Sequence, residues 1–443
     1  MKKLLIGFFA LSLILAFTMP ATATDVEVTG EYYVRGLYDS NSSLQTSSTA
    51  NASYNQRLRI SAIFKVARGL KLTTRMDALE MTWGQNLPMS QNPATGPLGT
   101  KIGYQNEASS WSVEMTKLDF ATKFGLISVG LWDTNTWGLD FGNNSYTTGS
   151  IMWLKPVGKF LLLAKIEKPY EKDAKQVNGD TYADLDGDYF IAAAIYNTPT
   201  LTAGLLYKYI RGAGNRDLNV GVPYGLLTTI DVLSPYFKFK AGDAYVEGQL
   251  YWANGESVPE DGSFYPDSDI EGLNWYVMGK YKIAAFTVGG LAAYAQGDDP
   301  TTATTNEGLL TGGWDWNPCL ILWNDDFNYY NAGYLGHVNG AATDGEMRNA
   351  YIYQVFAEAA PIDKLTIKAS FTYAKADEQP AKGWVDKDYG TEFDVSASYK
   401  IYDNLDYMVG FGYFWAGDYY KGTNSAHTID DTYLLVNKLT LSF

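Results

Sequence analysis

Charged side chains recur at every second position in several segments of the sequence, and they are the main candidates for chemistry. In an extended strand, residues two apart point to the same face. Arg57, Arg59 and Lys65 share one parity and Arg75 follows on the next such segment, which predicts a basic ladder across two strands. We expect residues of both positive and negative charge on the face of the sheet that contacts water. They are Arg57, Arg59, Lys65, Arg75, Asp77, Lys117, Lys208, Glu247, Lys280, Glu358, Lys368, Glu392 and Asp394. These charges either select among ions through their field or only solvate this face and pair across strands.

A second group of candidates lies in the segment 297–347, which is far longer than an ordinary connection between elements. It contains an apolar stretch with Trp314, Trp316 and Trp323, followed by Asp325 and Asp326. Such apolar side chains are unfavourable in water, so we expect the segment to pack against the rest of the molecule. It either folds inward as a constriction or forms a self-packed cap that leaves the interior open.

Three aspartates alternate in the sequence Asp184-Leu-Asp186-Gly-Asp188, which resembles the start of a calcium-binding loop. Carboxylates at alternate positions around a Gly turn can converge on a hard cation. The Glu that such a loop places at its twelfth position is missing, since that position is Ile195. A structural Ca²⁺ is therefore one reading, and solvated loop acids that bridge lipopolysaccharide through divalent ions are the other. No other cofactor is expected.

The sequence does not predict an enzyme. It contains neither a G-x-S-x-G nucleophile elbow nor a phosphate-binding P-loop. Its two histidines, His337 and His427, both fall in expected loops, and no nucleophile is placed beside them by any motif. Cys319 is the single cysteine, which excludes an internal disulfide and Cys-cluster metal sites.

Alternating segments of about 10 to 14 residues must position these groups, and they recur from Val26 to Phe443. Eight short connections alternate with nine long ones, which predicts 18 antiparallel strands, with 16 as the alternative. Both termini then lie on the short-turn side. One parity is apolar and aromatic and the other polar, as in Leu365 to Tyr373. This pattern predicts a single all-β, up-and-down transmembrane barrel that is apolar outside and wet inside.

The first residues indicate export from the cytoplasm. Lys2 and Lys3 precede a mostly apolar run from Leu4 to Met19, and Ala21-Thr-Ala23 forms a small-residue cleavage site. We expect residues 1–23 to be a signal peptide and 24–443 to be the barrel domain; an uncleaved anchor is the alternative. Losing two lysines takes the net charge from −15 to −17, which argues against nucleic acid as a partner. The 34 Tyr and 12 Trp suit aromatic girdles at a membrane surface.

Two stretches resemble known families. The final strand, from Asp431 to Phe443, resembles the closing strand of Gram-negative outer-membrane β-barrels, where a terminal Phe is read by the insertion machinery. Gln56 to Arg59, with the turn from Val66 to Glu80, looks like the first hairpin of alginate-export-type porins, which are 18-stranded single-chain pores. The resemblance implies a strongly basic lumen in the alginate exporter, whereas basic and acidic candidates are nearly balanced here. We therefore transfer the architecture and not the substrate.

The expected function is an outer-membrane porin for passive diffusion of small hydrophilic solutes and ions, with both termini periplasmic. The alternatives are a specific transporter or exporter of an anionic or aromatic solute, and a barrel sleeve within a multiprotein conduit. The expected partners are outer-membrane lipid, lipopolysaccharide and small polar solutes. The protein is expected to be a monomer or a homotrimer.

Overall fold

The computed structural model describes residues 25–83, 111–171, 184–215, 226–259, 266–326, 335–336, 342–343 and 345–443. The predicted signal peptide, the side chain of His337 and parts of the segment 297–347 lie outside these residues. No helix within the described residues is long and apolar enough to cross a membrane.

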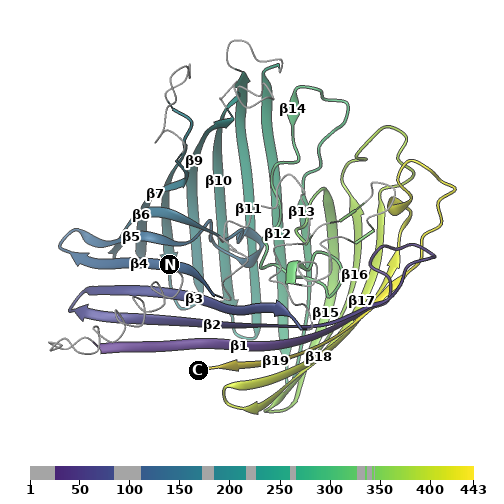
Figure 1. Ribbon diagram of the computed structural model, residues 1–443, viewed down its shortest axis with the longest axis horizontal. Coiled ribbons are helices and arrows are strands. Elements are labelled where there is room, and N and C mark those ends of the chain that lie inside the picture. Colours follow the sequence, from purple (N-terminus) through teal and green to yellow (C-terminus); the bar gives the residue numbers. More distant parts are fainter. Residues whose placement is uncertain are drawn as a thin grey trace, which may run out of the picture.

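The described chain forms one closed antiparallel β-barrel, shown in Figure 1. Eighteen strands build the wall, which excludes the 16-strand alternative, and β14 (Thr305–Asn306) is a two-residue strand in a loop that pairs with β12. The wall strands are β1 (Asp25–Asp39), β2 (Asn51–Ala67), β3 (Leu70–Thr82), β4 (Trp111–Thr122), β5 (Gly125–Thr134), β6 (Tyr146–Val157), β7 (Phe160–Tyr170), β8 (Gly187–Asn197), β9 (Leu201–Asn215), β10 (Leu226–Ala241), β11 (Ala244–Pro259), β12 (Ser268–Ile283), β13 (Phe286–Ala295), β15 (Ala350–Ile362), β16 (Leu365–Ala376), β17 (Asp388–Tyr402), β18 (Leu405–Ala416) and β19 (Thr432–Ser442).

The barrel closes where β1 pairs with β19, from Glu31 opposite Ser442 to Asp39 opposite Leu434. The backbone amide of Gly30 donates to the carbonyl of Phe443 at 2.7 Å, and the amide of Phe443 donates back at 3.0 Å. A Cβ on Gly30 would lie 2.5 Å from the Phe443 ring, so this glycine leaves room for the terminal aromatic. The terminal strand predicted from the sequence therefore forms the seam of the barrel.

The connections alternate in length, as predicted from the sequence. Turns of two or three residues join β2 to β3, β4 to β5 and so on around one rim, and the longer connections lie at the other. Gly158 and Gly242 begin two of these turns with φ of +60° and +59°, the left-handed conformation that tight hairpins need. The start of β1 pairs with the end of β2, Asp25 opposite Lys65, so both ends of the barrel domain lie at the short-turn rim.

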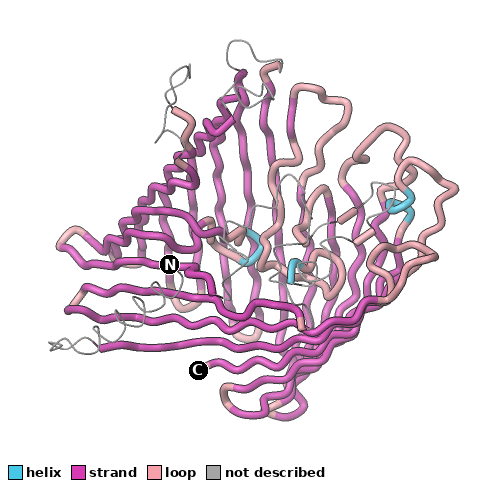
Figure 2. Tube along the Cα trace, in the orientation of Figure 1, coloured by secondary structure: helices cyan, strands magenta, loops and turns pink. Residues whose placement is uncertain are grey.

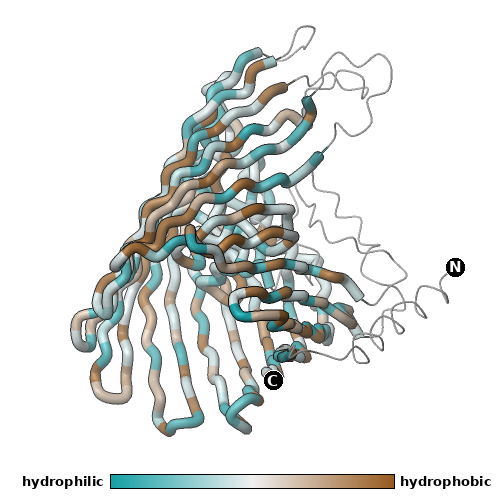
Figure 3. Tube along the Cα trace, turned by 90° about the vertical axis from the view of Figure 1, so that its left-hand side faces the viewer, coloured by the Kyte–Doolittle hydropathy of each residue, from teal (hydrophilic) through white to brown (hydrophobic). Residues whose placement is uncertain are grey.

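Side chains alternate between the two faces of the wall, and Figure 3 shows hydrophobic and hydrophilic residues alternating along the strands. On β15 and β16, Tyr353, Val355 and Phe371 are exposed, while the intervening Gln354 and Thr372 are buried. The buried parity contacts loop segments inside the barrel, so it is the inner face. The exposed apolar parity is the outer face, an arrangement suited to lipid outside and water inside.

Candidate functional site

Part of the long loop lies inside the barrel against β15–β17. The backbone amides of Ile321 and Leu322 donate to the two carboxyl oxygens of Glu392 at 2.7 and 2.8 Å. The Leu320 amide donates to Asp394 at 3.3 Å, and the Gln354 side chain donates to the Pro318 carbonyl at 2.8 Å. Glu392 is fully buried, so these contacts fasten the loop to the wall away from solvent.

A second connection, between β5 and β6, also folds inward and packs against β10 and β11. Trp137 donates from Nε1 to the carbonyl of Ser234 at 2.8 Å, and the Leu139 amide donates to Gln249 at 2.9 Å. The 3-10 helix η2 (Asp140–Gly142) forms in this connection and lies within the barrel outline in Figure 2. Sequence reasoning treated this connection as an ordinary loop. Its apolar run Trp137-Gly-Leu-Asp-Phe141 is the signal that would have found it.

The two inward loops contact each other. The Gly313 amide donates to the Phe141 carbonyl at 2.8 Å, and the Trp314 amide donates to Asn144 at 3.1 Å. The rings of Phe141 and Trp316 meet edge to face at 5.1 Å. Residues 135–144 and 312–326 thus form one connected partition, which we call the inner partition, between β10–β12 and β15–β17.

The inner partition reaches a third part of the wall through Arg35 on β1. The Arg35 guanidinium donates to the Asp326 carbonyl at 2.7 Å and lies 3.3 Å from its carboxylate. Arg35 is buried, whereas the Asp326 side chain is largely exposed. Trp316 and Trp323 are buried, and Trp323 packs edge to face on Tyr389 at 5.5 Å. The loop tryptophans are therefore structural contacts, and Asp315, Asp325 and Asp326 bring negative charge to the inner partition.

Asp315 lies close enough to other carboxylates of the inner partition for their charges to act on it. Its Oδ2 accepts from the Asn143 side chain at 2.8 Å. Partial burial raises the pKa of Asp315, and the nearby carboxylates of Asp140, Asp325 and Asp326 raise that pKa further. The inner partition thus has an acidic face.

The inner face of β1 to β9 contains most of the predicted basic residues, nearly all of them in ion pairs. Arg59 and Asp77 form a two-pronged pair at 2.7 and 2.6 Å, and Arg75 holds Asp133 in the same way at 2.6 and 2.9 Å. Other pairs on this wall include Arg57 with Glu31 at 3.6 Å, Lys117 with Asp119 at 3.7 Å, Lys165 with Glu167 at 2.7 Å, and Lys208 with Glu167 at 3.4 Å. Pairing across strands was one of the two readings of these charges.

Tyr33 is the centre of a cationic group beside the Arg35 contact. The Lys438 ammonium lies 4.6 Å from its ring centroid, and the guanidinium carbons of Arg57 and Arg35 lie at 5.1 and 5.9 Å. Among the described residues, no carboxylate lies within ion-pair distance of Lys438. The sequence pattern did not single out Lys438 or link it to Tyr33. The ring supplies the attraction that a carboxylate would otherwise supply.

The remaining predicted residues are spread around the barrel. Glu247 accepts hydrogen bonds from Tyr245 at 2.7 Å and Tyr276 at 3.0 Å. Lys280 lies 5.2 Å from the Tyr245 ring, and Lys368 lies 5.6 Å from the Phe356 ring. At the short-turn rim, Lys65 pairs with Asp25 and Glu27; on β15, Glu358 is exposed. The structure does not bring Glu247, Lys280, Lys368 or Glu358 together with the basic ladder, and Lys65 pairs away from the other members of the ladder.

The three aspartates of the calcium hypothesis do converge, with carboxylate oxygens within 4.8 Å of one another. Two basic side chains already contact them: Arg211 lies 2.5 Å from Asp184, and Lys168 contacts Asp186 and Asp188. The hydrogen bond from Arg211 lowers the pKa of Asp184. This pairing provides the counter-charge that a cation would otherwise provide, and calcium binding stays a prediction. The His427 side chain has one hydrogen bond among those of the described residues, from Nδ1 to the Lys421 carbonyl at 2.9 Å.

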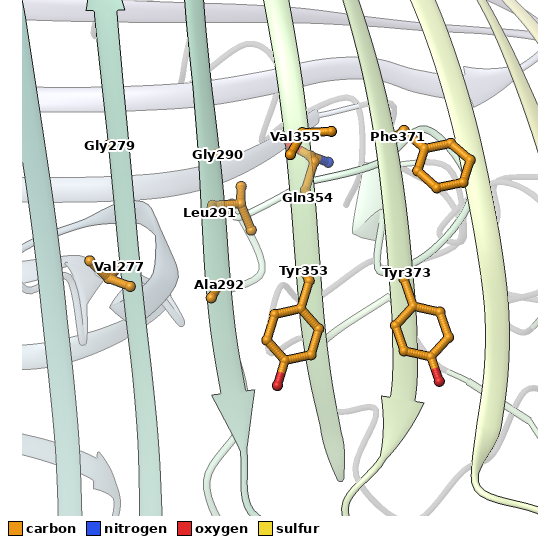
Figure 4. Close-up of a pocket in the computed structure, with 10 residues that line it drawn as sticks. All are labelled: Val277, Gly279, Gly290, Leu291, Ala292, Tyr353, Gln354, Val355, Phe371 and Tyr373. Carbon is orange, nitrogen blue, oxygen red and sulfur yellow. The ribbon is translucent and has the colours of Figure 1, made fainter.

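A shallow groove of about 470 Å³ lies on the outer face, shown in Figure 4. It runs across β12, β13, β15 and β16, where Gly279 and Gly290 leave space between Val277, Val355 and Phe371. This groove faces away from the interior and has an almost wholly apolar lining. It is a feature of the outer surface and not of the candidate site.

Comparison with known proteins found no matching family model and no curated relative. Solved structures do match in fold. OccK2 (OpdF) of Pseudomonas aeruginosa, solved in complex with glucuronate, has a TM-score of 0.53 at 10% identity, over 95% of this chain and 98% of its own. OccK5 (OpdH) and OpdK with vanillate, from the same organism, each have a TM-score of 0.50 at 12% identity, covering 94% of this chain and 98% and 99% of theirs. At these identities the likeness shows the fold, an 18-strand barrel of the kind found in outer-membrane porins.

Proposed function

We propose that this protein is an outer-membrane porin of a Gram-negative bacterium, with an aqueous channel for small hydrophilic solutes and ions. One observation carries the proposal: a closed wall that is apolar outside and lined inside by charged residues, with loops folded into it. A wall of this polarity is stable only with lipid around it and water within it. The short-turn rim and both termini are then periplasmic, and the long loops and lipopolysaccharide lie on the cell surface.

The inner partition supports a size limit for the solutes. It lies in the barrel interior and is fastened at Glu392, Arg35 and Gln249, so it would narrow the channel without being free to move away. We propose that the constriction lies between its acidic face and the inner face of β1–β4, which contains Arg57, Arg59 and Arg75. Opposed charges across a narrow aqueous passage make a transverse field that favours polar over apolar solutes.

A specific transporter for an anionic solute is the second candidate. The cationic group at Tyr33 favours it, because Lys438 has no carboxylate partner among the described residues. Two of the structural neighbours were solved with glucuronate and vanillate, both carboxylates. The resemblance to alginate-export-type porins stays a prediction.

Conductance in planar bilayers tests the porin proposal, and liposome swelling with sugars of increasing size tests the passive route. Purified protein is expected to conduct alone and to admit small neutral sugars. Reversal potentials in a salt gradient then report ion preference. Block by glucuronate or vanillate at low concentration, without swelling by neutral sugars, would favour the specific transporter. Protein that neither conducts nor swells liposomes, while folded by heat-modifiable gel migration, would refute both.

A further inference from the structure

We propose that Cys319, Glu392 and Asp394 form a binding site for one thiophilic divalent cation, Zn²⁺ or a metal of similar chemistry. The Cys319 Sγ and one oxygen of each carboxylate lie within 4.8 Å of one another. Their side chains are 3%, 0% and 6% exposed. Glu392 and Asp394 share the inner face of β17, and Cys319 comes from the inner partition. The site therefore exists only when the loop is docked.

One carboxylate oxygen of Asp394 is unsatisfied within the described part of the chain. Its Oδ2 accepts from the Leu320 amide at 3.3 Å and from Ser370 at 3.4 Å. Its Oδ1 is buried and has no hydrogen-bond donor among the described residues. The carboxyl group of Glu392 lies beside Asp394, and the two carboxyl groups can share a hydrogen bond when one of them is protonated. Two ionised carboxylates facing each other in a buried place repel, so either a proton or a cation must lie between them.

No basic side chain of the described residues supplies the counter-charge. Lys368 is close enough to act on Asp394 electrostatically, but it makes no ion pair with Asp394 or Glu392. The contrast with Asp184 is direct, because that cluster is neutralised by Lys168 and Arg211. Among the described residues, the cluster of Glu392 and Asp394 has no basic partner in an ion pair, whereas the cluster at Asp184 has two.

The donor set selects the class of metal. A sulfur and two carboxylate oxygens suit Zn²⁺ and similar ions, whereas Ca²⁺ and Mg²⁺ prefer oxygen alone. Zn–S and Zn–O bonds of about 2.3 and 2.1 Å place tetrahedral ligands about 3.6 Å apart. The ligand atoms, which lie within 4.8 Å of one another, would therefore approach by up to about 1.2 Å. Thr372 Oγ1, 3.4 Å from Sγ, is a nearby fourth oxygen. On binding, the thiol proton passes to solvent and a metal–sulfur bond forms.

Co²⁺ substitution tests the site with one unambiguous signal, because Cys319 is the only thiol in the chain. The tag-free mature protein is folded with Co²⁺ or Zn²⁺ present, so that the metal does not have to enter a closed site. We expect about one metal per chain and a thiolate-to-cobalt charge-transfer band. Cys319→Ser should abolish the band, and Asp394→Asn should weaken binding at least tenfold. The matched control Asp186→Asn, in the other acidic cluster, should leave the band unchanged.

Absence of the band in the folded wild-type protein would overturn the proposal, and so would a Zn²⁺ content that Cys319→Ser does not reduce. Either result means that Glu392 and Asp394 share a proton instead. Heat-modifiable migration checks that each variant is folded, and the wild-type band decides the matter if Cys319→Ser fails to fold. The readout is metal binding and not conductance, so the proposed channel function can fail without affecting it.

Discussion

Replacing Glu392 with alanine should release the long loop from the wall. The substitution removes the acceptors of two buried backbone amides, those of Ile321 and Leu322. Leaving a buried donor without a partner costs about 1–3 kcal/mol, so the docked state loses about 2–6 kcal/mol relative to the undocked one. At about 1.4 kcal/mol per factor of ten, the undocked population rises by roughly 30-fold to 10⁴-fold. Because the contacts of Arg35 and Gln354 still hold the loop, we expect an increase in the undocked population near the lower end of this range.

Two assays read this release independently, both with a chelator present so that a bound metal does not contribute. Single-channel recordings should show frequent transitions to a higher conductance than in the wild-type protein. Cys319, 3% exposed in the docked loop, should react with a thiol reagent at least about 30 times faster, in proportion to the undocked population. Glu358→Ala is the matched control, because Glu358 is on the same inner face but makes no contact with the loop.

Each assay can refute a different step. Unchanged thiol reactivity in a folded Glu392→Ala protein would show that Glu392 does not hold the loop. Faster thiol reaction with unchanged conductance would show that the loop is released but never narrowed the channel. In that case the inner partition would be only a packing element.

Three further outcomes are expected from the charges and faces of the wall. Arg75→Gln leaves the Asp133 carboxylate without its guanidinium, so the channel should become more permeable to cations. The expected change is about 0.5–1 kcal/mol, which is a two- to fivefold change in the cation-to-anion permeability ratio read from the reversal potential. An unchanged ratio would place this pair outside the ion path. Val355→Arg puts a charge on the outer face at a position 63% exposed and should cost about 2–4 kcal/mol of folding stability in lipid, seen as loss of the heat-modifiable band. Glu358→Arg, on the inner face of the same strand, should fold normally. Because the pKa of Asp315 is raised, Asp315 should lose its charge at a higher pH than a free Asp when the pH falls from 7. The docked loop favours the protonated form of Asp315, so the docked state should gain stability as the pH falls through this range. Asp315→Asn should remove this pH-dependent part of cation selectivity, and an identical pH profile in the variant would contradict the assignment.

Much of the barrel could be predicted from the sequence, because its signals are local. Alternation along a strand, as in Leu365 to Tyr373, follows from the two-residue repeat of the backbone and needs no tertiary information. The alternating short and long connections predicted the number of strands and their order around the wall. The terminal strand was also predicted from the sequence, and the structure places its last residue, Phe443, against Gly30 at the seam between β19 and β1.

The arrangement of the interior could not be predicted in the same way, since it depends on which residues from distant segments meet. Nothing near Glu392 in the sequence shows that its carboxylate accepts amides 70 residues earlier. The inward fold of the connection after β5 was missed, because its apolar run is short and its partners lie on β10 and β11.

The position of a residue in the strand alternation predicts which face of the wall its charge lies on, but not which group pairs with that charge. The sequence by itself determined the barrel, its two faces and the charged character of the interior. Only the tertiary structure decided that Arg59 and Arg75 each pair with an aspartate, that Lys438 lies over the Tyr33 ring, and that Cys319 lies near two buried carboxylates. The physical reason is the range of the interactions: the backbone repeat acts between neighbours in the chain, whereas pairing and burial act between neighbours in space.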